Sequence, residues 1–530
     1  MDADLASIQN VRTLVETAKH AQKAYKTFSQ AQVDHVVAAM AEAGADAAAR
    51  LAVLAHEETG FGRVESKTEK NRFATTTLHD RMQGMKTVGV IRKIENDTIW
   101  EIATPMGVVG ALIPSTNPTS TAMYKAIIAA KARCGIVMSP HPRGNACTLE
   151  ALRVVAQAAY NAGAPQGLFG CMSEVTLEGT NALLEHPKID LILATGGSAM
   201  VKAAYSKGKP AYGVGSGNVP VYVDRSANLQ KAAADILYGT SFDWGTLCST
   251  ERSIVADQPI KAKLVAALQA EGGYLMCASE KDQLRRMLLV NGRLNTEQVG
   301  QSPERIAQLA GFRVPAGTKA LIGEVSEVGK AEPLSMETLS PILALYTEDG
   351  WQAGCERCIQ VLHFGGIGHT LALHASNQRV IEAFAMEKPS MRIVVNTVAA
   401  LGSVGYTTNL FPAMTLGPGT LGGSITSDNI SPMHLLNVKR LAFEANPVTA
   451  PKAARPASTP RLSARASTLG ASWMADVEAN LLARAGNPPV RPAKAAQPAS
   501  EPAATKPQQV TTGDLGEEQI QALIRRFRKG

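Results

Sequence analysis

Residues 104–145 read TPMGVVGALIPSTNPTSTAMYKAIIAAKARCGIVMSPHPRGN, and this stretch decides the fold. An apolar run ends at Pro114, a polar loop follows, and a segment with helical spacing leads to a second apolar run, GIVMSP. A helix of this length between two buried strands is typical of a βαβ unit, in which the strands are parallel. The sequence therefore predicts a parallel sheet covered by helices.

The alternation of strands and helices extends outward from this stretch. It continues as far as residue 207, and a second series of strands and helices starts near Ser253. Residues 5–60 have the periodicity of helices, which ends at Gly60, and 87–110 have the pattern of short β segments. We therefore predict an α/β fold with two α/β lobes.

The composition is that of an ordinary globular protein. Of the 530 residues, 45% are hydrophobic and 19% are charged, which excludes a wholly disordered chain, a collagen-like repeat and a coiled-coil rod. The formal net charge is +7, but residues 451–530 hold 12 basic and 6 acidic side chains, so the preceding body is nearly neutral. A neutral body gives no reason to expect nucleic acid as a partner.

The N-terminal residues MDADLASIQN lack the basic and apolar regions of a secretory signal. No apolar run approaches the roughly 18–20 residues needed to cross a bilayer. The seven cysteines are odd in number and scattered, which argues against a disulfide framework. We therefore expect a cytoplasmic protein with no membrane span.

One pair of cysteines has the spacing of a metal-binding motif. Cys355 and Cys358 form a C-x-x-C, and His363 follows, but no fourth ligand stands at the spacing of a metal site. The same spacing places both cysteines on one face of a helix. We interpret the pair as structural and expect no metal.

Five later blocks, taken with residues 104–145, resemble a known family. These blocks are ILATGGSAMVKAAYSKGKPAYGVGSGNVPVYVD, FDWGTLCSTERSIVAD, METLSPILALY, HFGGIGHT and MTLGPGTLGGSITSDNISPMHLLNVKR. In this order they resemble the CoA-acylating aldehyde dehydrogenases, including the aldehyde half of bifunctional aldehyde–alcohol dehydrogenases, over roughly residues 5–445.

The resemblance implies the aldehyde dehydrogenase fold. This fold has a Rossmann-like cofactor-binding lobe, an α/β catalytic lobe and a β-hairpin through which copies assemble, here as a homodimer or tetramer. We expect the following division: 1–245 for binding NAD and coenzyme A, including hairpin residues 88–104, then 246–432 for catalysis, 433–450 returning to the cofactor and oligomerisation parts, 451–511 as a linker, and 512–530 as a terminal helix.

Cys248, in GTLCSTE, falls on the family's nucleophile. A thiolate adds to an aldehyde, and loss of hydride from the thiohemiacetal leaves a thioester. Asn117, in STNPTS, is implied to donate to the developing alkoxide together with the Cys248 N–H. From the residues alone, Cys248 is also compatible with a buried loop cysteine. Asn117 before a proline is equally a common turn opener, and both roles can hold at once.

The resemblance also implies a set of residues that bind NAD and coenzyme A. Some of them lie between a strand and a helix, where glycines let phosphates approach backbone N–H groups. A solvated arginine and a solvated loop carboxylate are the alternatives for Arg143 and Glu337. The implied set is Ser139, His141, Arg143, Thr195, Gly196, Gly197, Gly215 and Glu337.

One departure from the wider superfamily concerns the fate of the thioester. Hydrolytic members carry a glutamate that activates water, whereas Gly213 and Val214 stand at the corresponding place here. No general base for water is visible there, so the acyl-enzyme should wait for a thiol such as that of coenzyme A. His369, in GIGHT, is a candidate to assist catalysis, with a satisfied core histidine as the alternative.

The C-terminal residues differ in composition from the rest. Residues 451–511 are rich in proline and alanine and cannot bury enough apolar surface to offset their ordering entropy, so we interpret them as a linker. Residues 512–530 carry an apolar stripe from Ile520 to Phe527 at helical spacing. The arrangement resembles the encapsulation peptides of bacterial microcompartments, which implies binding to a shell protein. A helix packed on its own protein or on a membrane surface is the alternative.

We therefore expect oxidation of propionaldehyde or acetaldehyde with NAD and coenzyme A, inside a microcompartment. The nearest alternative is an acylating dehydrogenase for sulfoacetaldehyde or succinate semialdehyde, free in the cytosol. A hydrolytic dehydrogenase is disfavoured by the missing glutamate. A scaffold with a degenerate catalytic body is disfavoured by the presence of Cys248 and Asn117.

Overall fold

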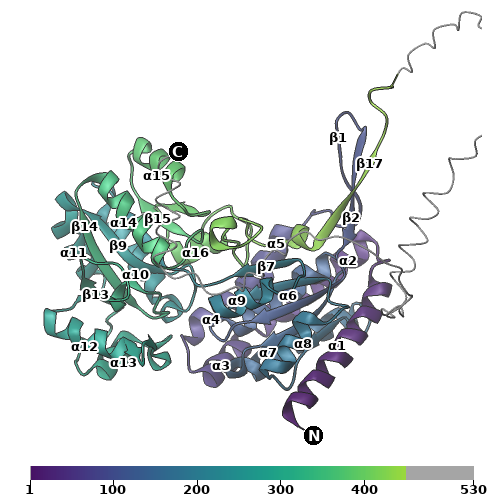
Figure 1. The fold of residues 1–530 in the computed structure, drawn as a ribbon, viewed down its shortest axis with the longest axis horizontal. Coiled ribbons are helices and arrows are strands. Elements are labelled where there is room, and N and C mark those ends of the chain that lie inside the picture. The colour runs from purple at the N-terminus through teal and green to yellow at the C-terminus, as the bar shows by residue number, and fades with distance from the viewer. Residues whose placement is uncertain (1, 449–530) are drawn as a thin grey trace, which may run out of the picture. The chain divides into compact units, whose positions relative to one another are not determined.

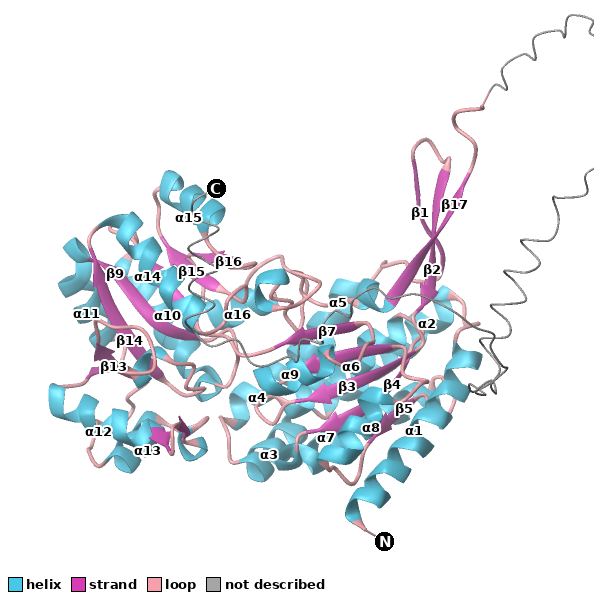
Figure 2. Ribbon diagram, viewed as in Figure 1, coloured by secondary structure: helices cyan, strands magenta, loops and turns pink. Residues whose placement is uncertain are grey.

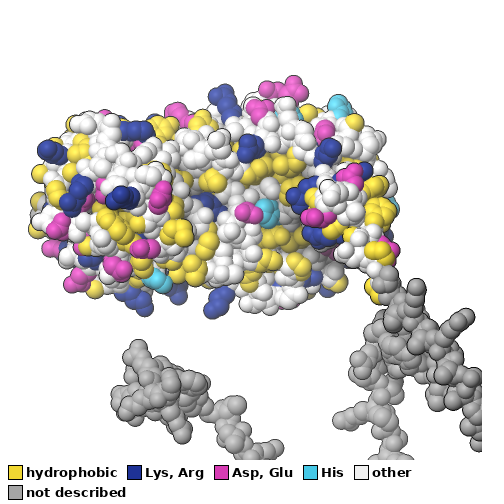
Figure 3. All heavy atoms as spheres, turned by 90° about the horizontal axis from the view of Figure 1, so that it is seen from above, with side chains coloured by type: hydrophobic (Ala, Val, Ile, Leu, Met, Phe, Trp, Pro, Cys, Tyr) yellow, Lys and Arg dark blue, Asp and Glu magenta, His cyan; other side chains and the backbone are white. Residues whose placement is uncertain are grey.

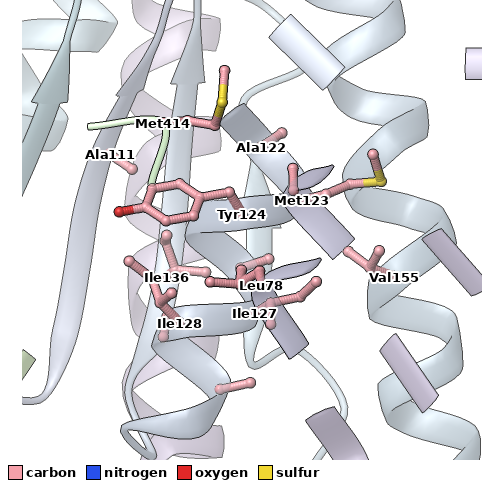
Figure 4. Close-up of a cluster of buried hydrophobic side chains, with 14 of the residues drawn as sticks. Leu78, Ala111, Ala122, Met123, Tyr124, Ile127, Ile128, Ile136, Val155 and Met414 are labelled. Atoms are coloured by element: carbon pink, nitrogen blue, oxygen red, sulfur yellow. The ribbon is translucent and has the colours of Figure 1, made fainter. Parts of the chain in front are cut away.

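The predicted βαβ unit lies at the centre of the first lobe. In the computed structural model, which describes residues 2–448, it consists of β3 (Val108–Ile113), α6 (Pro118–Lys131) and β4 (Gly135–Pro140). β3 and β4 are parallel, and every residue of the three elements is buried. Figure 4 shows Tyr124 and Ile127 of α6 among the side chains of this core. Burial on all sides explains why this stretch reads as nearly continuous apolar sequence.

The first lobe is a five-stranded parallel sheet in the order β5-β4-β3-β6-β7, with helices on both faces (Figures 1 and 2). Helices α2, α6 and α7 pack into one core, and α1, α8 and α9 into another. The remaining elements are α1 (Ala3–Tyr25), α2 (Gln30–Asp46), α3 (Ala48–Thr59), α4 (Val64–Arg72), α5 (Leu78–Met82), α7 (Asn145–Asn161), β5 (Phe169–Cys171), α8 (Leu177–Glu185), β6 (Leu191–Thr195), α9 (Ser198–Tyr205) and β7 (Ala211–Val214).

Local sequence signals set the ends of the N-terminal helices. Ser29 and Gln32 form a reciprocal capping box at the start of α2. Gly60 ends α3 in the left-handed conformation, with φ of 70°, as the sequence predicted.

The second lobe is a seven-stranded parallel sheet in the order β10-β13-β14-β9-β8-β15-β16. Cys355 and Cys358 both lie buried on one helix of this lobe, as expected from their spacing. The elements are β8 (Val219–Val223), α10 (Leu229–Ser241), β9 (Glu251–Asp257), α11 (Lys261–Ala270), β10 (Gly273–Leu275), α12 (Ala278–Leu288), the short hairpin of β11 (Leu289–Val290) and β12 (Arg293–Leu294), α13 (Pro303–Ala310), β13 (Ala320–Glu324), β14 (Ile342–Glu348), α14 (Gly350–Phe364), β15 (Leu371–His374), α15 (Gln378–Glu387), β16 (Ile393–Val395) and α16 (Ala399–Val404).

The boundaries between the lobes differ from those expected. The chain enters the second lobe before residue 246, because β8 pairs with β9 and β15 in the seven-stranded sheet. It also returns before residue 433, since Leu401, Met414 and Ile430 pack into the core of the first lobe. The strand β8 follows the last strand of the first lobe after only a few residues, so no break in composition marks the crossing.

The expected β-hairpin forms a separate antiparallel sheet. β1 (Gly89–Ile94) pairs with β2 (Ile99–Pro105), and β17 (Leu436–Ala442) adds to the other edge of β2. Its role in assembly stays a prediction.

Charged side chains of both signs are spread over the visible surface (Figure 3). Figure 3 shows basic and acidic side chains interspersed on the visible face, in agreement with the nearly neutral body. In the described part of the chain, no helix has the length and apolar character needed to span a membrane. The expected linker and terminal helix lie outside the described residues.

Candidate active site

A cavity of about 230 Å³ lies where loops of the two lobes meet. Its walls come from the loop after β3, the turn between β6 and α9, the residues after β7, the loop before β9 and the loop before β14. The predicted site residues that line it are Asn117, His141, Thr195, Gly196, Gly197, Gly215, Cys248 and Glu337.

Cys248 and His369 form a pair at this cavity. The Cys248 Sγ lies 3.2 Å from the His369 Nε2, and the His369 Nδ1 lies 2.9 Å from the hydroxyl of Thr370. Gly217 lets the two loops approach, because a Cβ there would lie 2.1 Å from the Cys248 carbonyl oxygen. His369, which sequence alone could not separate from a core histidine, is thus a partner of the cysteine.

Electrostatics favour an uncharged pair at rest. Burial raises the pKa of the Cys248 thiol, and the nearby Glu337 carboxylate adds to this effect. Burial lowers the pKa of His369 to about 3, with the Arg392 guanidinium acting in the same direction. The imidazole is therefore neutral near pH 7 and has a lone pair with which it can accept the thiol proton as sulfur attacks.

Asn117 lies at the start of α6, and its side-chain amide lies between the Lys70 ammonium and the Thr246 carbonyl. Its Nδ2 donates to the Thr246 carbonyl at 3.2 Å and to the Thr116 hydroxyl at 3.1 Å, while its Oδ1 accepts from the Lys70 ammonium. Thr246 stands two residues before Cys248, so the donor side of the amide faces the nucleophile loop. Both N–H groups of the amide have acceptors in this structure, so donation to an oxyanion requires that one of them be released, and this role stays a prediction.

The turn between β6 and α9 suits an anionic ligand. Added Cβ atoms at Gly196 and Gly197 would meet nothing within 4 Å, so the backbone is open to the cavity at the start of α9. Glu337 lines the same cavity, and its Oε1 accepts from the Gly217 N–H at 3.0 Å. A phosphate-accepting turn and a carboxylate that can accept from a ribose hydroxyl fit a dinucleotide.

Two predicted cofactor residues do not line the cavity. Ser139 lies within β4, is 3% exposed, and its Oγ is 2.9 Å from the Thr180 Oγ1 of α8, so its part in cofactor binding stays a prediction. Arg143 is exposed, with its guanidinium 5.6 Å from the centre of the Phe61 ring. Its contact with a phosphate stays a prediction.

Neither residue at the place of the missing glutamate supplies a base. A Cβ at Gly213 would lie 2.6 Å from Val201 and 2.8 Å from the Tyr205 hydroxyl, whereas Val214 lines the cavity with an apolar side chain. In the described part of the chain, Glu337 is the one carboxylate that lines this cavity, and it is bonded to the backbone of Gly217.

Several residues of the site were not predicted from the sequence. Thr246 lines the cavity, and its carbonyl oxygen accepts a hydrogen bond from the Asn117 amide. Lys67 and Lys70 of α4 and the Asp243 carboxylate lie buried directly behind Asn117. The two lysines stand three residues apart in the polar segment VESKTEKNR, which resembles an ordinary solvated helix and gives no sign of burial.

Comparison with known proteins agrees with this geometry. The model of the aldehyde dehydrogenase family matches residues 1–283, and the chain belongs to this family. It is 42% identical over 446 residues to the bifunctional aldehyde-alcohol dehydrogenase AdhE of Escherichia coli K12, covering 83% of this chain and 50% of AdhE. The chain thus spans about half the length of the first curated relatives that it matches.

Two further relatives match this chain over most of their own length. The chain is 38% identical over 444 residues to a sulfoacetaldehyde dehydrogenase (acylating) of Cupriavidus necator, covering 82% of this chain and 90% of that one. The crystal structure of an acetylating aldehyde dehydrogenase from Geobacillus thermoglucosidasius superimposes with a TM-score of 0.84 at 48% identity, covering 85% and 100% of the two chains. Within its family, the chain is thus similar to acylating and acetylating members.

Proposed function

We propose that this protein oxidises a short, uncharged aldehyde and transfers the acyl group to coenzyme A. The observation that carries the proposal is the Cys248 thiol, which lines the cavity together with Asn117 and lies 3.2 Å from the buried, neutral His369. A nucleophile, a base and an oxyanion donor are the groups that acyl transfer through a thioester requires.

In the first half-reaction the Cys248 sulfur attacks the aldehyde carbon while the His369 Nε2 accepts the thiol proton. The carbonyl oxygen becomes an alkoxide, and the Asn117 Nδ2 and the Cys248 N–H donate to it. Thr195, Gly196, Gly197 and Glu337 would hold NAD, which when bound accepts the hydride from the thiohemiacetal carbon. Collapse of the alkoxide leaves a thioester on Cys248.

In the second half-reaction the thiol of coenzyme A attacks the thioester carbon. His369, after releasing the first proton to solvent, accepts the proton of this thiol, and the same two donors stabilise the oxyanion before the Cys248 thiolate departs and takes that proton from His369. Water is a poor competitor because it needs stronger activation than a thiol, and neither Gly213 nor Val214, at the place of the glutamate of hydrolytic relatives, can activate it. The products are acyl-CoA, NADH and a proton.

An apolar extension of the cavity indicates the class of aldehyde. It has a volume of about 10 Å³ and shares Leu247, Val404 and Met414 with the main cavity. Its remaining walls are Phe73, Phe242, Leu401 and Tyr406, together with Glu69 and Lys70. Even one water needs roughly 10–15 Å³, so this space leaves room for a very small group at most and favours a short aldehyde chain.

The same lining disfavours anionic substrates. In the described residues, Lys70 is the one cation that lines either space, and it is bonded to Asp243 and Asn117. The Glu69 carboxylate would repel a sulfonate or carboxylate. We therefore favour propionaldehyde or acetaldehyde over sulfoacetaldehyde and succinate semialdehyde.

Substrate selectivity tests this part of the proposal. We expect kcat/KM for propionaldehyde to exceed that for sulfoacetaldehyde and succinate semialdehyde by at least about 100-fold, because an unpaired anion would lose its hydration in an apolar pocket. Initial rates of NADH formation with each aldehyde, at saturating NAD and coenzyme A, measure the ratio. Equal or higher kcat/KM for an anionic aldehyde would reverse the assignment.

We also propose that the terminal segment directs the enzyme to a microcompartment shell, and that the sheet of β1, β2 and β17 joins copies of the chain. The first proposal is supported by the amphipathic pattern of residues 512–530. The second is supported by the exposed apolar side chains of Leu441 and Phe443 in and after the edge strand β17.

Deletion of residues 512–530 separates targeting from catalysis. We expect the shortened chain to lose association with shell protein and to retain its turnover, because no described site residue lies in this segment. Co-sedimentation with shells and an NADH assay measure the two properties. Unchanged co-sedimentation would refute the targeting role.

A further inference from the structure

A buried cluster of charged residues lies directly behind Asn117. Lys67 and Lys70 stand three residues apart on α4, with side chains 2% and 4% exposed, and both contact the Asp243 carboxylate, which is fully buried. The Lys67 Nζ lies 3.2 Å from the Asp243 Oδ2 and 3.3 Å from the Thr116 carbonyl oxygen. The cluster therefore joins α4, the loop that carries Asn117 and the segment that precedes Cys248.

The backbone around Asp243 is adapted to this cluster. Asp243 and Trp244 both have φ of 48°, a conformation that costs non-glycine residues of order 1 kcal/mol or more. The Asp243 Oδ1 accepts from the Arg63 N–H at 2.7 Å, and a Cβ at Gly62 would lie 2.0 Å from the same oxygen. The Thr246 hydroxyl donates to the Asp243 Oδ2 at 2.5 Å, which ties the cluster to the nucleophile loop.

The cluster holds two ammonium groups against one carboxylate. Burial alone would raise the pKa of Asp243, but the charges of Lys67 and Lys70 outweigh it and lower that pKa, so the carboxylate is ionised. Burial lowers the pKa of Lys70 to about 8, with the Asp243 charge opposing it. Pairing with Asp243 requires only one lysine, and a second buried cation is costly unless it has another use.

The contacts of Lys70 show what that use is. An ammonium group only donates hydrogen bonds, so the Asn117 atom that it contacts must be the oxygen. The contact prevents the Asn117 amide from flipping, so its Nδ2 points toward Thr246 and the loop that carries Cys248. A cation on the amide oxygen also polarises the amide and makes its N–H groups stronger donors.

We propose that Lys70 is a positioning residue for both half-reactions: its buried ammonium, held by Asp243, fixes and polarises the Asn117 amide that stabilises the oxyanion. The inference rests on the proposed function, because it assigns a task to Asn117 in that reaction. Lys70 acts through Asn117 and exchanges no proton with the substrate. Lys67 secures the neighbouring Thr116 carbonyl and the common partner Asp243.

A double-mutant cycle tests the proposal. We expect Lys70→Met to lower kcat by about 100-fold, the scale of a lost oxyanion donor, with KM for NAD and coenzyme A changed by less than about twofold. In an Asn117→Ala background the same substitution should lower kcat by less than about threefold, since the residue it acts through is already gone. A purely structural role would instead give losses that multiply.

Two further variants keep the test decisive. Lys131, 3% exposed and paired with Asp34 at the far end of α6, supplies a matched control, and Lys131→Met should retain the wild-type kcat even if its melting temperature falls. If Lys70→Met does not fold, Lys70→Gln tests the proposal instead, because the glutamine amide can still donate to Asp243 but carries no charge. For that variant we expect an intermediate loss of kcat, and again no further loss beside Asn117→Ala.

The outcomes distinguish this inference from the proposed function. An unchanged kcat in the Lys70 variants would overturn the role of Lys70. So would a double variant whose loss of kcat equals the product of the two single losses. In both cases an active wild-type protein would leave the proposed function standing. A wild-type protein that forms no NADH from any of the aldehydes with NAD and coenzyme A would overturn both.

Discussion

Substitution Cys248→Ala should abolish aldehyde oxidation, with a fall in kcat of about 10⁴-fold or more, the scale found when an enzymatic nucleophile is removed. No other cysteine of the described chain can replace it, since among the residues lining the cavity Cys248 is the one thiol. His369 and Asn117 would remain in place, so the loss would report the missing sulfur rather than a collapsed site. NADH formation at 340 nm and the melting temperature measure the two effects.

The matched control for this variant is Cys277→Ala. Cys277 is exposed at the start of α12, away from the cavity, and its removal should leave kcat unchanged. A thioester should also be detectable by mass as an acyl group on the wild-type protein incubated with aldehyde and NAD, and absent from Cys248→Ala. Residual turnover above about 1% of wild type in Cys248→Ala would refute the covalent mechanism.

Substitution Asn117→Ala should lower kcat by about 10²- to 10³-fold with little change in KM, because the amide donates to charge that develops only in the transition state. Asn117→Asp supplies the stricter comparison. A carboxylate can still accept from Lys70 but has no N–H, so it should be at least as slow as the alanine variant. Steady-state kinetics of both variants with propionaldehyde measure the losses.

A contrary result for Asn117 would have a clear meaning. If Asn117→Asp retained kcat within about threefold of wild type, the amide would have no part in stabilising the oxyanion, and the Cys248 N–H alone would form the oxyanion site. A rise in KM at constant kcat would instead assign Asn117 to substrate binding.

The sequence predicted most of the fold because its elements are strongly patterned. The continuous apolar runs of β3, β4 and β6 and the helices between them are buried as expected. The crossing at β8 was missed, because a buried parallel strand has the same composition in either sheet and its sheet is decided by long-range pairing with β9 and β15.

The site was predicted less evenly. Cys248, Asn117 and Glu337 lie together as the family motifs implied, since each motif belongs to a loop at the shared edge of the lobes. The sequence did not place the Ser139 hydroxyl against Thr180, because within a fully buried strand it does not show which of two faces a side chain takes. Lys67, Lys70 and Asp243 could not be predicted, since their partners lie more than 100 residues apart in the chain.

Dependence on coenzyme A tests the central claim most directly. The measurement is NADH formation from propionaldehyde and NAD by the wild-type protein, with and without coenzyme A. We predict continuous turnover only when coenzyme A is present and, in its absence, at most one NADH per active site as Cys248 becomes acylated. Continuous turnover to the free acid without coenzyme A would contradict the account, because it would require a water-activating base, and neither Gly213 nor Val214 at the corresponding place can act as one.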